Sequence, residues 1–331
     1  MSGLEHGGRL NQAVRQWGIP RSDWLDLSTG ISPYGYPIPA IPDAVWQRLP
    51  EEDDGLDAVA RDWLKLPVDT GCLPVAGSQP ALQTLPALRR PCRVGVVAPA
   101  YAEHARAWRQ AGHDVVPLAA TAVAGTLPRL DVLVCVNPNN PSGALLPAET
   151  LRGWHQQLAG RGGWLVVDEA FLDASNGTSL AAQAHQTGLI VLRSLGKFFG
   201  LAGLRAGLMV AEPALCSAMQ AALGPWAMSH PARYVMAQAL QDRAWQQQQR
   251  QRLREDRKRL DGVLSAAGLS PQGDSDLFAW CPDDQAQERF ESLARQGVLV
   301  RYFTEPAALR FGLAGSEVQW DRLRSALSVS A

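Results

Sequence analysis

The sequence has few cysteines, few histidines and almost no net charge, and each shortage excludes a class of protein. The five cysteines of the 331-residue chain form no Cys-x-x-Cys pair, so we expect reduced thiols in a cytoplasmic protein. The six histidines show no metal-ligand spacing, and we therefore expect no metal site. A formal net charge of −1 gives no electrostatic reason to bind nucleic acid or a membrane surface.

The chain also lacks a long apolar run. Its start has no apolar signal segment, and three prolines interrupt the uncharged stretch 213–232, so we expect no membrane span. A chain of 331 residues is longer than one hydrophobic core usually serves. We therefore expect one large domain and one smaller domain.

The sequence does contain a series of short apolar runs separated by helical lengths. Six runs have the character of strands: 94–98, 114–118, 132–136, 164–167, 189–192 and 206–210. Their spacing predicts an α/β fold with a mostly parallel central sheet flanked by helices. We assign this large domain to 40–230, and a smaller α+β domain to 231–331 together with the N-terminal segment 1–39.

Lys197 is the most informative residue, because it follows an apolar run and lies in a glycine-rich loop. An amine that forms an imine must be partly unprotonated at neutral pH. Burial and a nearby cation such as Arg205 both lower the pKa of a lysine. Ser194 and Arg205 flank Lys197 as candidate phosphate ligands, and the combination indicates pyridoxal 5′-phosphate. The alternative is an ordinary surface lysine in a loop.

Asp168 follows the apolar run 164–167, at the end where open α/β sheets bind their ligands. A carboxylate there would keep the pyridine nitrogen of the cofactor protonated, which makes the ring an electron sink. The alternative is a Mg²⁺-binding acid, but the chain has no nucleotide phosphate loop around Lys197 to accompany it. Strand alternation should direct Glu169 to the opposite face, so we expect Glu169→Gln to be mild.

Three further segments place polar or aromatic side chains after apolar runs. Asn140 lies in an Asn-Pro turn and could donate its amide to the phenolate oxygen of the cofactor, unless the segment is merely a turn. Ser78 and Gln79 open a helix after a glycine turn, where free amides suit a phosphate. Tyr101 could stack on the ring, or it could be half-buried packing.

The order of these motifs resembles the aspartate aminotransferase superfamily of pyridoxal phosphate enzymes (fold type I), over residues 20 to 315. The resemblance implies a homodimer with Lys197 as the Schiff-base lysine and Asp168 as the partner of the pyridine nitrogen. It implies that Asn140 binds the phenolate oxygen and that Tyr101 stacks on the ring. It also implies ligands of the cofactor phosphate at Ser78, Gln79, Ser194 and Arg205.

The amino terminus is similar to that of one family in this superfamily, the L-threonine-O-3-phosphate decarboxylases. The similarity rests on His6-Gly7-Gly8, Asp26-Leu27-Ser28 and Ile31-Ser32-Pro33. It implies decarboxylation of an amino-acid phosphate, L-threonine O-3-phosphate, to (R)-1-amino-2-propanol O-2-phosphate for cobalamin biosynthesis. The implied substrate-binding residues are His6, Gly7, Ser32, Arg301 and Arg310, with Arg310 on the α-carboxylate.

Two positions depart from the family pattern. Phe171 replaces a tyrosine whose hydroxyl reaches the phenolate oxygen in many relatives, which leaves Asn140 as the main ligand there. Leu49 lies near the place of a tyrosine that reaches the cofactor phosphate across the dimer interface, and leucine cannot make that contact.

Two alternative functions remain open. One is a histidinol-phosphate-type aminotransferase that transfers an amino group to 2-oxoglutarate, because this family shares the later motifs. The other is a non-catalytic regulator that retains the pocket, and such a protein would be expected to lose Lys197 or Asp168, which are both present.

Overall fold

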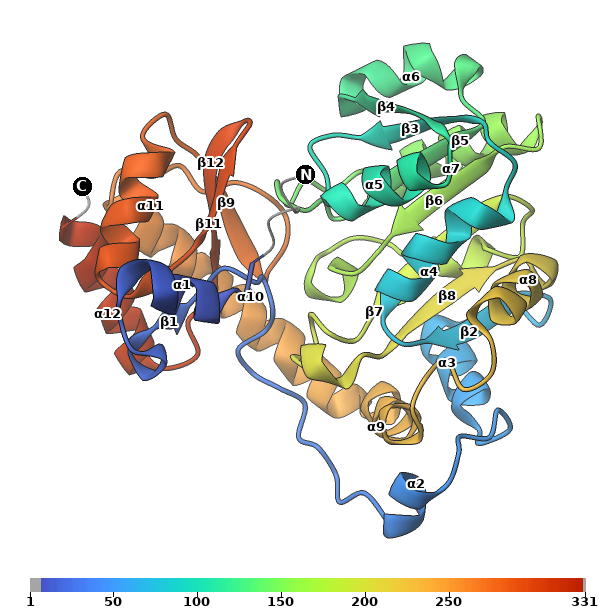
Figure 1. The fold of residues 1–331 in the computed structure, drawn as a ribbon, viewed down its shortest axis with the longest axis horizontal. Helices are drawn as coiled ribbons and strands as arrows, with labels where there is room; N and C mark the ends of the chain where they lie inside the picture. The colour runs from blue at the N-terminus through green and yellow to red at the C-terminus, as the bar shows by residue number, and fades with distance from the viewer. Residues whose placement is uncertain (1–6, 330–331) are drawn as a thin grey trace.

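The computed structural model describes residues 7–329, which form two lobes joined by a long helix (Figure 1). The larger lobe contains a seven-stranded sheet, and the smaller lobe contains a three-stranded sheet and a two-stranded pair. The joining helix is α10 (Arg243–Ala266). The expected α/β fold, with a large and mostly parallel sheet, is confirmed, while the domain boundaries at 40 and 230 stay a prediction.

The large sheet has the strand order β2-β8-β7-β6-β5-β3-β4. Its strands are β2 (Gly71–Val75), β3 (Arg93–Val97), β4 (Asp114–Leu118), β5 (Val132–Val136), β6 (Trp164–Asp168), β7 (Leu189–Ser194) and β8 (Gly207–Ala211). Neighbouring strands are parallel except at β8, which is antiparallel to both β2 and β7.

Six of these strands match the six apolar runs, whereas β2 was missed. This strand contains Pro74, and a proline argues against a strand unless the strand lies at the edge of its sheet. The structure places β2 at that edge, where only β8 pairs with it.

Alternation along the central strands separates two buried layers. Val132 and Val134 pack on one face of the sheet, whereas Leu133 and Cys135 pack on the other. The first face is covered by α4 (Ser78–Thr84), α5 (Ala102–Gln110) and α8 (Pro213–Leu223). The second is covered by α3 (Leu56–Leu64), α7 (Ala148–Ala159) and α9 (His230–Gln241). Because both faces of the sheet are covered at its centre, the parallel strand β5 is buried and apolar throughout.

The smaller lobe combines both ends of the chain. Its antiparallel strands are β9 (Phe278–Pro282), β11 (Arg301–Thr304) and β12 (Ala307–Gly312), in the order β11-β12-β9. The N-terminal strand β1 (Leu25–Asp26) pairs in parallel with β10 (Val298–Leu299). The helices of this lobe are α1 (Leu10–Trp17), α11 (Ala286–Arg295) and α12 (Glu317–Val329). The segment between β1 and the larger lobe crosses the structure along α10 (Figure 1).

Two short α-helices remain, α2 (Asp43–Gln47) below the larger lobe and α6 (Val123–Thr126) above it (Figure 1). Within residues 7–329, no helix has both the length and the apolar character that crossing a membrane requires. The longest helix, α10, is rich in glutamine and arginine.

Candidate active site

A cavity of about 450 Å³ receives side chains from both lobes. The larger lobe contributes Asp168, Ser194 and Lys197 at the carboxyl ends of parallel strands β6 and β7. The smaller lobe contributes Arg301 and Arg310. Ligands of open α/β sheets bind outside the carboxyl ends of the strands, so the position agrees with the sequence-based expectation.

The amine of Lys197 lies in an apolar and positively charged environment. Its Nζ atom is 5.4 Å from the centre of the Phe171 ring. The pKa of Lys197 is lowered to about 8, mainly by burial; Arg310 and Arg205 contribute to the lowering, and Asp168 opposes it. At this pKa about one amine in ten is unprotonated at pH 7. Sequence reasoning anticipated burial and Arg205 but missed the stronger effect of Arg310.

Asp168 is buried and held from two sides. Its Oδ2 atom lies 3.0 Å from Nε2 of His104, and its Oδ1 atom accepts a hydrogen bond of 3.0 Å from the Ala170 amide. Sequence reasoning missed His104. The available signal was the Tyr101-x-x-His104 spacing, because residues three apart lie on the same side of a helix. The two rings meet edge to face, with centroids 6.2 Å apart.

Glu169 lies behind Asp168 in a buried ionic network. Arg193 Nη1 donates to Glu169 Oε2 at 2.7 Å, and Arg193 Nη2 donates to Asp173 Oδ1 at 2.5 Å. The Ser179 hydroxyl also donates to Glu169. Glu169 is not among the described residues that line the cavity, so a mild effect of Glu169→Gln on turnover stays a prediction, but breaking this buried ion pair should lower the stability of the fold.

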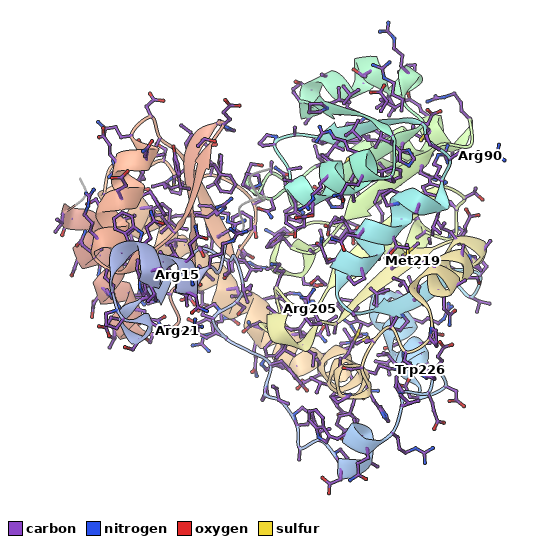
Figure 2. The ribbon with its side chains drawn as sticks, viewed as in Figure 1. Arg15, Arg21, Arg90, Arg205, Met219 and Trp226 are labelled. Carbon is purple, nitrogen blue, oxygen red and sulfur yellow. The ribbon has the colours of Figure 1, made fainter. Side chains whose placement is uncertain are left out.

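Ser78, Gln79 and Arg205 meet at the first turn of α4. Gly77 precedes this turn with a φ of 77°, and a Cβ atom there would lie only 2.9 Å from Nη2 of Arg205. Glycine therefore allows the guanidinium to approach the helix start. Figure 2 shows Arg205 on the side of the larger lobe that faces the smaller one.

These groups and Ser194 also line the cavity, and together they supply hydroxyl, amide and guanidinium donors. Ser194 Oγ accepts a hydrogen bond of 3.2 Å from the Gly196 amide. Such a donor set fits the phosphate of pyridoxal phosphate.

Tyr101 and Asn140 both line the cavity and both have a fixed partner. The Tyr101 hydroxyl donates to Gln79 Oε1 at 3.0 Å, and burial raises the pKa of Tyr101 to about 12, so the phenol stays protonated. Asn140 Oδ1 accepts a hydrogen bond from Nη1 of Arg310. This bond orients the side chain and leaves the amide nitrogen of Asn140 to serve as a donor elsewhere.

The two departures from the family pattern have different settings. Phe171 is buried, lines the cavity and packs edge-on against Phe278, with centroids 5.2 Å apart. It thus provides an apolar wall next to Lys197 without a hydroxyl. Leu49 is 60% exposed and lies outside the set of described residues that line the cavity.

Arg301 and Arg310 lie directly opposite each other on the antiparallel strands β11 and β12. Arg310 is buried, and its Nη2 donates to the Ser28 carbonyl at 2.7 Å. Its Nε atom is buried without a hydrogen-bond partner among the described residues. Burial and the charge of Arg301 lower the pKa of Arg310 to about 9. Like charges at opposite positions of a strand pair are destabilising, so this part of the cavity favours bound anions.

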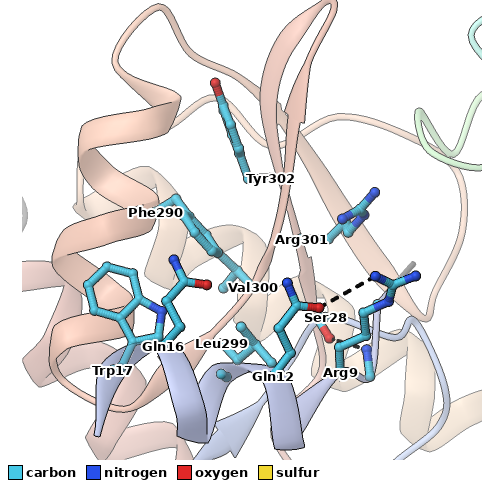
Figure 3. A pocket seen from close by; sticks show the side chains of 13 residues that line it. Arg9, Gln12, Gln16, Trp17, Ser28, Phe290, Leu299, Val300, Arg301 and Tyr302 are labelled. Atoms are coloured by element: carbon cyan, nitrogen blue, oxygen red, sulfur yellow. Dashed lines mark hydrogen bonds between the residues drawn. The ribbon is translucent and has the colours of Figure 1, made fainter. Parts of the chain in front are cut away.

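Gly7 and Arg301 also line a smaller hollow of about 80 Å³ next to the cavity (Figure 3). In the same view Tyr302 and Arg301 extend to different sides of the strand.

His6 lies outside the described residues. Ser32 is not among the described residues that line the cavity, and its hydroxyl instead accepts a hydrogen bond from Gln249. Its predicted contact with substrate stays a prediction.

Within residues 7–329, no group of three or more His, Cys, Asp or Glu side chains is placed to hold a metal ion. The five cysteines are free thiols.

Comparison with known proteins gives consistent results. Residues 58–327 match the family model of class I and II aminotransferases. The chain is 51% identical over 324 residues to the threonine-phosphate decarboxylase of Pseudomonas aeruginosa, which covers 98% of this chain and 97% of the relative. It is 40% identical over 335 residues to the threonine-phosphate decarboxylase of a Sinorhizobium species, covering 98% of each.

The fold is also similar to a solved structure, the histidinol-phosphate aminotransferase of Sinorhizobium meliloti in complex with pyridoxal-5′-phosphate. The TM-score is 0.83 at 20% sequence identity, covering 100% of this chain and 98% of that chain. At this identity the likeness shows the fold alone.

Proposed function

This chain belongs to the class I and II aminotransferase family, and we propose that it decarboxylates L-threonine O-3-phosphate with pyridoxal 5′-phosphate as its cofactor. The product is (R)-1-amino-2-propanol O-2-phosphate, which serves cobalamin biosynthesis. The observation that carries this proposal is the pair of opposed guanidiniums, Arg301 and Arg310, facing the same cavity as Lys197.

The substrate has two anionic groups that suit this pair. Its carboxylate carries one negative charge, and its phosphate carries about −1.5 to −2 at neutral pH. We assign the carboxylate to Arg310, whose guanidinium can hold it bidentately, and the phosphate to Arg301 together with Gly7. Two charge-assisted contacts fix the orientation of the substrate in the cavity, which selects the bond that breaks.

The residues around Lys197 fit the cofactor. Arg205, Ser78 and Ser194 would hold its phosphate, Asp168 its pyridine nitrogen and Asn140 its phenolate oxygen. Pyridoxal phosphate, when bound, supplies an electron sink for the electron pair left by departing carbon dioxide.

Lys197 has two tasks in this proposal. Its partly unprotonated amine attaches the cofactor, because the pKa near 8 makes the nucleophilic form accessible at neutral pH. Its Nζ atom can also hold the proton that replaces the lost carboxylate on the product. Phe171 excludes water from this side of the amine, since its ring is apolar and buried.

The aminotransferase alternative has less support. Two relatives that match nearly the whole chain, at 51% and 40% identity, are threonine-phosphate decarboxylases. The regulator alternative also has less support, because Lys197 and Asp168 are both present in the cavity.

We also propose that the enzyme is a cytoplasmic homodimer. Trp46, Leu49 and Trp226 are 64%, 60% and 58% exposed, and large apolar side chains at the surface favour association. Trp226 lies at the outer edge of the larger lobe (Figure 2). Light scattering should give twice the 35.8 kDa of one chain, and a monomeric mass at micromolar concentration would refute the dimer.

Substrate preference tests the function. We expect kcat/KM for L-threonine O-3-phosphate to exceed that for free L-threonine by about a hundredfold or more, because the phosphate contact contributes a few kcal/mol. Carbon dioxide release is the readout. Equal use of free threonine, or better turnover of histidinol phosphate with 2-oxoglutarate, would show that the proposal is wrong.

A further inference from the structure

The loop that carries Lys197 makes backbone hydrogen bonds to the N-terminal segment as well as to its neighbours in sequence. The Ser32 amide donates to the Lys197 carbonyl at 3.0 Å, and the Tyr36 amide donates to the Phe199 carbonyl at 2.8 Å. The two segments lie so close that a Cβ atom on Gly200, whose φ is 65°, would be 2.8 Å from Cα of Gly35. The backbone of the lysine loop is therefore positioned by residues far away in sequence.

The Phe198 carbonyl lies between the carbonyls of Lys197 and Phe199 in the chain, and it accepts a hydrogen bond from a side chain. Gln249 Nε2 donates to it at 3.2 Å, and the same nitrogen also lies 2.7 Å from Ser32 Oγ and 3.1 Å from the Tyr34 carbonyl. Gln249 is 4% exposed. One buried amide thus connects the lysine loop with the N-terminal segment.

Gln249 belongs to α10, the helix that joins the two lobes (Figure 1). One helical turn earlier, Trp245 stacks on Phe199 with centroids 5.6 Å apart and meets Phe198 edge-on at 5.8 Å. Residues four apart lie on the same face of a helix. This face of α10 therefore supports the lysine loop through both aromatic packing and hydrogen bonds.

We propose that Gln249 is a positioning residue that keeps Lys197 in its buried place, by connecting the Phe198 carbonyl to the segment 32–34. The inference rests on the proposed role of Lys197 as the cofactor-binding amine. Without the amide of Gln249, two carbonyls and a hydroxyl lose a buried donor, and water would be drawn to the lysine loop. Hydration of the loop reverses the desolvation of the Lys197 amine.

The charged groups that face Lys197 come from other elements. They are Asp168 at the end of β6, Arg205 in the loop before β8, and Arg310 on β12. None of the three has a hydrogen bond to Gln249 among the described contacts. A change in the pKa of Lys197 on replacing Gln249 would therefore reflect a change in the burial of the amine, and not the loss of a hydrogen bond to one of these charged groups.

Gln246 offers a matched control in the same helix. It is 1% exposed, and its Nε2 donates to the Ala239 and Leu240 carbonyls at 2.8 and 3.0 Å. Its Oε1 accepts a hydrogen bond of 3.0 Å from Nε1 of Trp63. Gln246→Met thus removes a buried amide of the same kind, but one whose hydrogen bonds go to α3 and α9 and not to the lysine loop.

The test is amine labelling of the full-length, cofactor-free chain across pH 6 to 11. The chain has three lysines, Lys65, Lys197 and Lys258, and mass spectrometry can follow each one. Lys65 and Lys258 are exposed and serve as internal references. In the wild type we expect Lys197 to be labelled with a midpoint near pH 8.

Gln249→Met should raise the midpoint of Lys197 by about one pH unit, since part of the desolvation is lost. Gln246→Met should leave it unchanged, even if both variants lose similar thermal stability. An unchanged midpoint in Gln249→Met, or an equal shift in both variants, would overturn the inference. If Gln249→Met does not fold, Ser32→Ala can take its place, because it removes one acceptor of the Gln249 amide. Ser32→Ala should raise the Lys197 midpoint by a smaller amount, and an unchanged midpoint would overturn the inference.

The proposed function can be judged separately with the wild-type protein. Absence of decarboxylation by the wild type would count against the function, whatever the labelling shows. Normal decarboxylation with identical Lys197 midpoints in both glutamine variants would count against the role of Gln249 alone.

Discussion

The two sides of the cavity differ in how their charged and polar groups are satisfied. On the larger lobe, Asp168 has His104 within 3.0 Å and Tyr101 donates to Gln79 at 3.0 Å, so each group is oriented before a ligand arrives. On the smaller lobe, Arg301 and Arg310 oppose each other, and Arg310 keeps a buried Nε atom without a partner in the described chain. The cofactor side is thus oriented within the protein, whereas on the substrate side one buried donor, Nε of Arg310, is left for an anionic ligand.

The largest effect should come from Lys197→Ala. We expect turnover to fall by roughly 10⁴-fold or more, because the attachment point and proton carrier are lost together. The cofactor should still bind through the phosphate donors of the larger lobe, which a spectroscopic titration can measure. In the wild type, borohydride should fix the cofactor on Lys197, and an adduct on Lys65 or Lys258 instead would disprove the assignment.

Asp168→Ala should also abolish most turnover while leaving cofactor binding measurable. The expected loss is roughly 10²–10⁴-fold, because the pyridine nitrogen would lose the charge that keeps it protonated. His104→Ala provides the comparison, and its effect should be smaller, since His104 acts by orienting Asp168. If Asp168→Ala keeps full activity, the strand-end carboxylate has another role. Decarboxylation rates at saturating cofactor are the measurement.

The substrate side should respond to mutation in a different way. Arg301→Ala should raise KM for L-threonine O-3-phosphate by about 30–1000-fold, equivalent to roughly 2–4 kcal/mol, with little change in cofactor affinity. Arg310→Ala should reduce kcat as well, because Arg310 also orients Asn140. Arg205→Ala is the matching control on the cofactor side, and it should weaken cofactor binding more than substrate binding. If Arg301→Ala lost substrate affinity and cofactor affinity equally, the division of the cavity into a cofactor side and a substrate side would be wrong.

The smallest effect on catalysis should come from Glu169→Gln, behind the cofactor side. We expect the free energy of unfolding to fall by about 2–4 kcal/mol, because Arg193 would lose one of its two buried carboxylate partners. The turnover of the folded variant should stay within about twofold of wild type, since Glu169 does not line the cavity. Urea denaturation and steady-state kinetics would check both parts, and unchanged stability would refute the importance of the network.

Sequence reasoning worked best where a site residue is defined by its own strand. Lys197 and Asp168 each follow a buried apolar run, so both the strand and the residue at its end could be inferred from local pattern. Asn140 and Tyr101 were found in the same way. All four line the cavity.

Sequence reasoning missed the contacts between distant segments, and of the residues involved only His104 had a local signal, its spacing from Tyr101. His104 reaches Asp168 across 64 residues, and Gln249 reaches Ser32 across 217 residues. Nothing in the local pattern around Gln249 distinguishes it from the other glutamines of α10. The influence of Arg310 on the pKa of Lys197 was missed for the same reason, because it depends on how the two lobes meet.

The fate of the substrate carboxylate gives the most direct test of the proposed decarboxylation. Purified enzyme with pyridoxal phosphate would be given L-threonine O-3-phosphate labelled with ¹³C in the carboxylate, without any 2-oxo acid. We predict that the label leaves as carbon dioxide and bicarbonate, in an amount equal to the 1-amino-2-propanol O-2-phosphate formed. Retention of the label in an organic acid, or a requirement for 2-oxoglutarate, would contradict the account.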